Sequence, residues 1–246
     1  MATTTNPGTA DVQVLASAAQ DAAANFNTAS SLVSRTYDGV APTTAMNSTA
    51  LDPTNTSPIP VTVSFSQAVT GFIESDIVPF NASISNFLGA GDTYTFDLTP
   101  SGQGLVSADI ADSVAQDAAT NFNTAAPTFS RTFDSISPDV TLTSLTPDPT
   151  NTTISVTATF TEDVTGFSTG GISVTNATMD NFTATSASVY TFDLLPTSDG
   201  SVTAQVDVSA AADAATNPNT ASNILSRGFD GTVPTVTIDQ AIAQPD

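Results

Sequence analysis

The chain has 246 residues, of which 24 are acidic and only three are basic, and its formal net charge is −21. Such an acidic chain offers no basic surface to phosphates, which argues against nucleic-acid binding. It has no cysteine for a disulfide, and all three basic residues are arginines, so no lysine is available for a Lys–Asn isopeptide bridge. No apolar run is long enough for a membrane-spanning helix, and the opening MATTTNPG lacks the pattern of a signal peptide.

The first 39 residues contain segments that return twice further along the chain. Residues 10–14 are apolar at every second position, which is typical of a strand with one buried face. The loop DAAANFNTAS begins at Asp21 and returns with small changes at Asp117 and Asp213, 96 residues apart each time. This period predicts a chain built from repeated units.

Two units are complete, at residues 40–135 and 136–231. Residues 1–39 match only the final third of a unit, and residues 232–246 match only its opening, so we expect the first strand of a further repeat there. We interpret the chain as a window onto a longer array.

Within each complete unit the periodicity is that of strands. In the first, residues 61–65, 94–98 and 106–110 alternate between apolar and polar side chains, and the second repeats this pattern. Short strands separated by Pro, Gly, Asn and Asp clusters are typical of antiparallel sandwiches. The sequence therefore predicts an all-β protein made of tandem immunoglobulin-like antiparallel β-sandwiches in a linear array.

These units resemble the bacterial immunoglobulin-like repeats of large cell-surface and adhesin proteins. The resemblance rests on VTATFTEDVTGF, GISVTNATMDNF, YTFDLLPTSDGSVTAQV, AAADAATNPNTAS and SRGFDG, and it extends over nearly the whole chain. It implies an extracellular spacer on a cell surface, with calcium bound in loops or at domain junctions. The chain departs from the family where glycine often precedes the first Asn of the loop, since Ala24, Thr120 and Thr216 occupy that position.

The recurring loop, which we call the Asp-Asn-Asn loop, has two interpretations. Its Asp could cap a single helical turn of alanines, with an Asn in the left-handed conformation that ends the turn. Alternatively, its side-chain oxygens could be part of a calcium site, because hard cations bind several oxygen ligands. The residues concerned in the two complete units are Asp117, Asn121, Asn123, Asp213, Asn217 and Asn219.

An immunoglobulin-like strand order would bring these loops to junctions that other acids also reach. At the junction entering the second complete unit, the expected calcium ligands are Asp52, Asp134, Asp139, Glu162, Asp163, Asp213, Asn217 and Asn219. At the preceding junction they are Asp38, Asp117, Asn121 and Asn123. Acids this close repel one another unless a cation lies among them. The first complete unit reads SQAVTGF where the second reads TEDVTGF, so we expect a weaker site there.

The three basic residues, Arg35, Arg131 and Arg227, occupy the same place in each repeat. Strand parity puts them on the apolar side or at its rim, with the head paired to an Asp or to loop carbonyls. A structural role is favoured over the alternative, a hot spot for partner binding.

An enzyme is not expected, because the chain has no His, Cys or Lys around which to build a site. The first hypothesis is a structural repeat segment of an extracellular stalk, adhesin or fibre, whose partners are neighbouring repeats of the same protein. One alternative is a filament subunit joined head to tail to other copies by strand exchange. The other alternative is a module that binds carbohydrate or a host protein, but exposed aromatic side chains are not expected.

Overall fold

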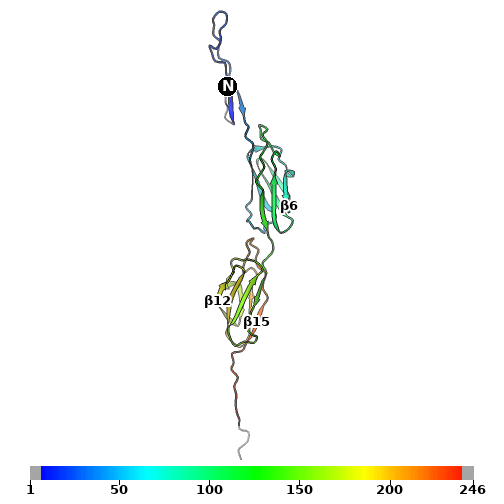
Figure 1. Cartoon of the computed structure of the whole chain (residues 1–246), viewed down its shortest axis with the longest axis vertical. Helices are drawn as coiled ribbons and strands as arrows, with labels where there is room; N and C mark the ends of the chain where they lie inside the picture. The colour runs from blue at the N-terminus through cyan, green and yellow to red at the C-terminus, as the bar shows by residue number, and fades with distance from the viewer. Residues whose placement is uncertain (1–6, 240–246) are drawn as a thin grey trace, which may run out of the picture. The chain divides into compact units, whose positions relative to one another are not determined.

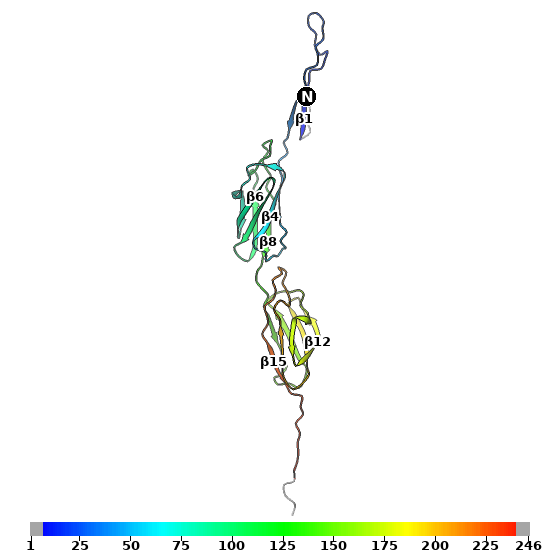
Figure 2. The ribbon, with the colours of Figure 1, turned by 180° about the vertical axis from the view of Figure 1, so that it is seen from behind.

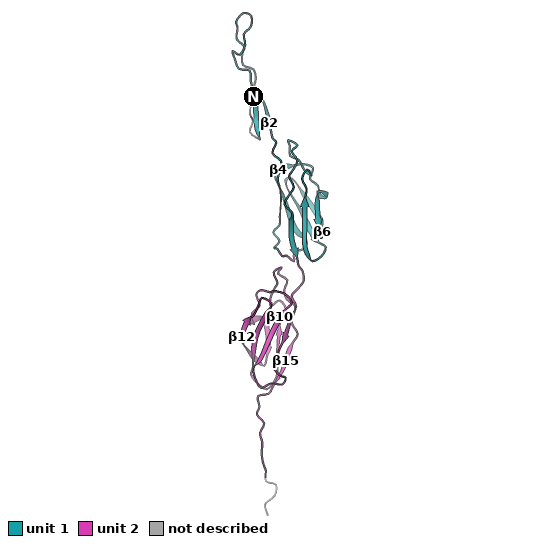
Figure 3. Ribbon diagram, viewed as in Figure 1, with its two compact units in different colours: residues 1–52, 56–133 teal, residues 53–55, 134–246 magenta. Residues whose placement is uncertain are grey.

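The computed structural model describes residues 7–239, which form strands, turns and two short 3-10 helices (Figure 1). They divide into two compact units (Figure 3). The first unit contains the chain up to residue 52 together with residues 56–133, and the second contains residues 53–55 together with the chain from residue 134. No helix in the described part of the chain is long and apolar enough to cross a membrane.

The first unit contains an antiparallel sandwich of two sheets, with strand orders β3-β4-β6 and β5-β7-β8 (Figures 1 and 2). A short 3-10 helix, η1, precedes β5. The elements are β3 (Thr44–Asn47), β4 (Ile59–Val69), η1 (Glu74–Asp76), β5 (Ile77–Phe80), β6 (Ala82–Pro100), β7 (Gly104–Ile110) and β8 (Phe129–Phe133).

The second unit is a sandwich of the same construction, with strand orders β12-β13-β10-β9 and β11-β14-β15. Its strands β12 and β13 correspond in sequence to the single long strand β6. The elements are β9 (Val140–Thr143), β10 (Ile154–Phe160), η2 (Thr169–Gly171), β11 (Ile172–Thr175), β12 (Ala177–Ala184), β13 (Val189–Pro196), β14 (Gly200–Val206) and β15 (Leu225–Phe229). The predicted all-β, tandem immunoglobulin-like fold is confirmed.

The cores follow from the alternation of apolar residues. Ile59, Val63 and Leu98 are completely buried on the inner faces of the first sandwich, while the residues between them face outward. Burying one such side chain contributes about 1.5–3 kcal/mol to folding. The second sandwich has the equivalent residues Ile154 and Leu194 at 0–1% exposure.

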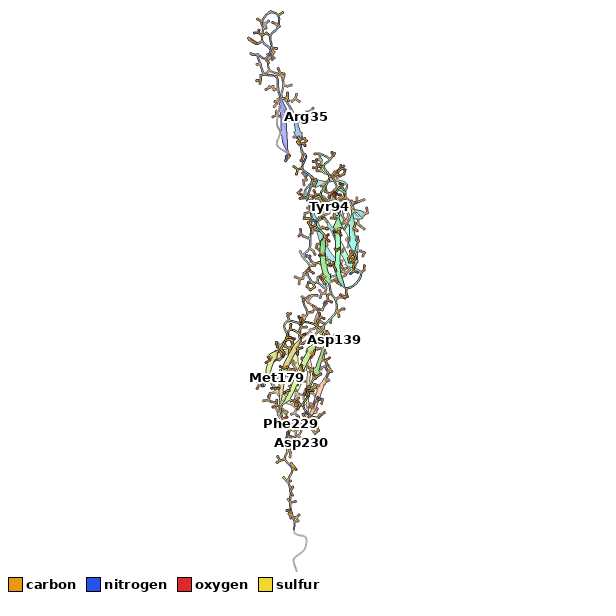
Figure 4. The ribbon with its side chains drawn as sticks, in the orientation of Figure 1. Arg35, Tyr94, Asp139, Met179, Phe229 and Asp230 are labelled. Carbon is orange, nitrogen blue, oxygen red and sulfur yellow. The ribbon has the colours of Figure 1, made fainter. Side chains whose placement is uncertain are left out.

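Each core also contains a cluster of four aromatic rings. In the first unit Tyr94 (Figure 4) lies within 5.0–5.9 Å, centroid to centroid, of Phe65, Phe72 and Phe87. In the second unit Tyr190 has the same neighbours at 4.9–5.9 Å, namely Phe160, Phe167 and Phe182. Aromatic pairs in this geometry add about 0.5–1.5 kcal/mol beyond the area they bury. The repeat is therefore conserved between the two units at the level of side-chain packing.

The N-terminal partial repeat forms an antiparallel hairpin of β1 (Gly8–Val12) and β2 (Val33–Tyr37). In sequence these strands match β7 and β8. No second sheet covers the hairpin within the described residues, so Val12 and Val33 are 64% and 52% exposed, whereas Ala108 and Phe129 at the matching positions are buried.

At the other end of the chain, residues 231–239 form no strand. The remainder of the further repeat expected at residues 232–246 lies outside the described residues. Within the second unit, Asp139 lies at one end of the sandwich, and Phe229 and Asp230 lie at the opposite end (Figure 4). The chain therefore crosses the full length of this unit between β9 and β15.

The Asp-Asn-Asn loops are turns rather than helical turns, and the expectation that an Asn adopts the left-handed conformation in them is wrong. The preceding residue adopts it instead, with φ of 65° at Ala24, 68° at Thr120 and 71° at Thr216. A side chain with a Cβ is strained in this conformation, by about 1–2 kcal/mol. These are the positions where the family often has glycine.

The strain predicts that Thr216→Gly stabilises the second unit. Thr216 is exposed, so the change removes little packing, and the gain is partly offset by the greater backbone freedom of glycine in the unfolded chain. We expect a net gain of about 0.5–1 kcal/mol in the free energy of unfolding, measured by urea denaturation. The exposed Ala214, whose φ is not positive, provides the control, because Ala214→Gly should lower stability. Destabilisation by both changes would contradict the prediction.

Candidate metal centre

The Asp of each Asp-Asn-Asn loop organises the loop through its carboxylate. In the first unit, Asp117 Oδ1 accepts the backbone N–H groups of Ala119 at 2.8 Å and Asn121 at 2.9 Å, and Oδ2 accepts Asn121 Nδ2 at 2.9 Å. The side-chain hydrogen bond from Asn121 contributes most to lowering the pKa of Asp117 below its ordinary value. In the second unit, Asp213 Oδ1 accepts Asn217 N–H and Oδ2 accepts Asn217 Nδ2, both at 2.8 Å.

The side chain of the second Asn of each loop forms hydrogen bonds with the backbone of the loop. Asn123 is 2% exposed, its Oδ1 accepts the backbone N–H of Ala115, and its Nδ2 donates to the Ala111 carbonyl. Asn219 repeats this role through Ala211. Neither amide oxygen is free for a cation, so the structure favours a structural role for these two residues.

In the first unit a glutamine completes the surroundings of the loop carboxylate. Gln67 Nε2 donates to Asp117 Oδ2 at 3.0 Å and to the Val40 carbonyl at 2.7 Å. With Asn121 this gives Asp117 Oδ2 two neutral hydrogen-bond donors. These hydrogen bonds stabilise the negative charge of the carboxylate.

In the second unit, Glu162 stands where the first unit has Gln67. It lies in the loop between β10 and β11. Two backbone hydrogen bonds between Thr165 and Ala212, of 2.8 and 3.1 Å, hold this loop against the Asp-Asn-Asn loop. One carboxylate oxygen from each of Asp134, Glu162 and Asp213 lies within 4.8 Å of the others. We call these three residues the carboxylate cluster.

The carboxylate cluster is partly removed from water. Asp213 is 4% exposed, and the other two residues are half-buried. Burial is the largest cause that raises the pKa of Glu162, followed by the negative charges of Asp213 and Asp134. The amide of Gln67 donates a hydrogen bond to Asp117, but an ionised carboxylate at the matching position cannot donate one to Asp213. Glu162 therefore replaces an attractive contact by electrostatic repulsion.

Of the other acids expected at the junctions, Asp38 reaches the Asp-Asn-Asn loop of the first unit, where its backbone carbonyl accepts Asn121 Nδ2 at 3.1 Å, as the Asp134 carbonyl accepts Asn217 Nδ2 in the second unit. The Asp38 carboxylate accepts the backbone N–H of Val40.

The remaining acids lie elsewhere. Asp52 accepts the backbone N–H of Thr132 within the first unit, and Asp139 accepts the hydroxyl of Thr220. Asp163 is exposed and is not part of the cluster. Among the described residues, only three of the acids expected at the second junction come together.

The donor set fits a hard cation. Three carboxylates supply up to six oxygens, and calcium takes six to eight oxygen ligands, including waters, in flexible geometry. Asn217 turns its amide nitrogen to Asp213 Oδ2 and to the Asp134 carbonyl, 3.0 Å away, so it positions two members of the cluster. The sequence reasoning missed the role of Gln67, although the difference between SQAVTGF and TEDVTGF was a visible signal.

Two of the arginines connect the last strand of a unit, by hydrogen bonds, to the loop that follows its first strand. Arg131 Nε donates to the Ala50 carbonyl at 3.1 Å and Nη2 to the Ser48 carbonyl at 3.4 Å. Arg227 Nε donates to the Thr146 carbonyl at 3.1 Å and Nη2 to the Ser144 carbonyl at 2.8 Å. Both guanidinium groups donate these hydrogen bonds to backbone carbonyls rather than to acids.

These contacts predict that Arg227→Met destabilises the second unit. The change leaves the loop carbonyls without their charged donor, and such a hydrogen bond contributes about 1.5–3 kcal/mol. Calorimetry should record a lower melting temperature for this unit. Arg35 is exposed and contacts the carbonyl of the adjacent Ser34, so Arg35→Met serves as the control and should have almost no effect. Equal melting temperatures for wild type and Arg227→Met would refute the structural role.

Comparison with known proteins gives a match to one family model and similarity to many solved structures, two of which follow. The model of the bacterial Ig-like domain family matches residues 38–132 and 134–227. The crystal structure of invasin, a bacterial integrin-binding protein, is 15% identical with a TM-score of 0.38, over 71% of this chain and 39% of that protein. Yersinia pseudotuberculosis InvD is 12% identical with a TM-score of 0.33, over 79% of this chain and 60% of that protein. No curated protein sequence matches significantly.

Proposed function

The chain belongs to the bacterial Ig-like domain family, and we propose that it is a repeat segment of an extracellular bacterial surface stalk, adhesin or fibre that acts as a spacer. One observation carries this proposal. The same sandwich, with the same aromatic cluster, recurs after 96 residues, as expected when copy number sets length. The second unit supports it further, because its chain enters at one end and leaves at the other (Figure 4).

A mechanical role also agrees with the chemistry of the chain. It has no His, Cys or Lys, and the buried polar side chains of the loops hydrogen-bond to their own backbone. A catalytic site instead needs a nucleophile or a proton-transfer group beside a pocket. We therefore propose a non-enzymatic protein.

Calcium at the carboxylate cluster is the second part of the proposal. Without a counter-ion, Glu162 faces two other acids in a half-buried position, and a divalent cation would offset that repulsion. Because Asp134 belongs to the segment that leads into the second sandwich, a bound ion would fix this segment to two of its loops. The first unit has Gln67 at the matching position and is proposed to need no ion there.

Imaging and surface labelling test the spacer function. An antibody against the second unit should label intact cells, and electron micrographs of the native protein should show beads whose number follows the number of repeats. A protein confined to the cell interior, or a native particle in which length does not follow repeat number, would overturn the proposal.

A further inference from the structure

One exposed sheet face of the first unit carries apolar side chains, whereas the matching face of the second unit carries polar ones. On the outer face of the β5-β7-β8 sheet, Val78, Phe80 and Leu105 are 60%, 61% and 55% exposed. We call these three residues the unit-1 patch. The expectation that aromatic side chains are not exposed is therefore wrong at Phe80. Exposed apolar residues grouped in this way mark interaction sites more often than isolated ones do.

The register of the strands makes the unit-1 patch continuous. Phe80 lies opposite Ser107, and Val78 lies opposite Asp109. Ser107 is only 7% exposed, although it has the parity of the outer face. Leu105 is the next outward residue along β7 and is diagonal to Phe80, within reach of its side chain.

The second unit shows that folding does not require this patch. Its residues at the three matching positions are Ser173, Thr175 and Ser201, all exposed, on strands with the same pairing. Apolar side chains at these positions therefore add little to the stability of the sandwich while exposing apolar surface to water. A function specific to the first unit accounts for them.

Acidic residues lie beside the unit-1 patch at positions that are neutral in the second unit. Glu74 and Asp76 form the turn that leads into β5, and Asp109 pairs with Val78. The second unit has the neutral residues Thr169, Gly171 and Gln205 instead. Glu74 also lines a groove along the edge of β5 together with Ile73, Pro79 and Ile84. The second unit carries Asp207 in this region, where its carboxylate accepts the Ser173 hydroxyl. The two units thus differ here in apolar character and in the number and placement of acids.

We propose that this face of the first unit is a docking surface for a protein partner that presents apolar side chains flanked by lysine or arginine. The apolar centre would bury aliphatic or aromatic groups, and the acids beside it would pair with the cations. This interaction is additional to the spacer role and does not depend on it.

The charges of the chain argue against a second copy of itself as the occupant. A copy could supply only its three arginines, and Arg131 and Arg227 already donate to carbonyls of their own units. Strand addition at the edge of β5 is also disfavoured, because Pro79 has no N–H to offer. The partner would therefore contact side chains on the sheet face.

A pair of synthetic peptides tests the proposal on the full chain. The probe is acetyl-Lys-Phe-Lys-Val-Lys-Phe-Lys-amide, and the control, with serine at the three apolar positions, has the same charge. In NMR titrations at physiological salt, the probe should shift amide resonances of β5 and β7 saturably. The control peptide should bind at least about tenfold more weakly, because its apolar contacts are missing. Equal binding of the two peptides would overturn the proposal.

Variants that exchange residues between the units localise the binding. Val78→Ser/Phe80→Thr/Leu105→Ser gives the first unit the residues of the second at unchanged charge, and it should weaken probe binding at least about tenfold. Glu74→Thr/Asp109→Gln tests the acids alone and should also weaken binding. Ser173→Val/Thr175→Phe/Ser201→Leu should create a second apolar site. Unchanged probe binding by the first variant would refute the proposal. The proposal would also be refuted if the wild-type chain formed a dimer and this variant were a monomer, because the patch would then bind a second copy of the chain.

Discussion

Calcium should raise the melting temperature of the second unit by roughly 10–20 °C. Extracellular calcium modules bind with dissociation constants of roughly 10⁻⁴–10⁻³ M. When calcium exceeds the dissociation constant about a hundredfold, it stabilises the folded state by about 2.7 kcal/mol. For a domain of this size each kcal/mol shifts the melting temperature by roughly 4–8 °C. Calorimetry of the full chain in calcium and in chelator measures the shift.

The matched variant Glu162→Gln should abolish this response. It gives the second unit the residue that the first unit has at position 67, so an amide can donate to Asp213 as Gln67 does to Asp117. In chelator the variant should melt higher than wild type, because repulsion inside the carboxylate cluster is relieved. Glu74 is the only other glutamate, and Glu74→Gln controls for the loss of one charge. A calcium shift that survives Glu162→Gln would place the ion elsewhere.

The converse change, Gln67→Glu, should make the first unit depend on calcium. In chelator it replaces a hydrogen bond to the buried Asp117 by a second negative charge, and we expect a loss of about 1–3 kcal/mol in the free energy of unfolding. Calcium should restore much of that loss through a site equivalent to the one proposed for the second unit. Urea denaturation with and without calcium measures both effects.

The isosteric change Gln67→Met separates the two contributions. It removes the amide donor without adding a charge, so it should destabilise the first unit to the same extent in calcium and in chelator. If Gln67→Glu behaved in the same way, the glutamate would not be creating a cation site.

The sandwiches could be predicted from the sequence because burial alternates along a strand. Val61, Val63 and Phe65 are apolar at every second position, and all three are at most 5% exposed. The duplication strengthened this prediction, since each pattern could be read twice. Backbone conformation in the loops was harder to predict. Threonine gives no sequence signal for a left-handed residue, yet Thr120 and Thr216 adopt that conformation.

The carboxylate cluster could be predicted only in outline. Residue types and strand order indicated which loops carry acids, but not which oxygens remain available. The carboxylate of Asp139 accepts the hydroxyl of Thr220, and the amide of Asn219 is enclosed by its own loop, so neither joins the carboxylate cluster. Competition of this kind depends on the distances between side chains in the folded protein, which a linear sequence does not contain.

The path of the chain through the second unit has a consequence for how the sandwich resists stretching. Strand β9 begins at one end of the sandwich, and β15 ends at the opposite end (Figure 4). Tension applied between these two points of the second unit therefore pulls each strand along its own axis. Hydrogen bonds between antiparallel strands run perpendicular to the strands. Such a pull loads the bonds of a strand together, in shear, instead of opening them one after another. The connection of the strands thereby suits the second unit to resist tension applied between its two ends.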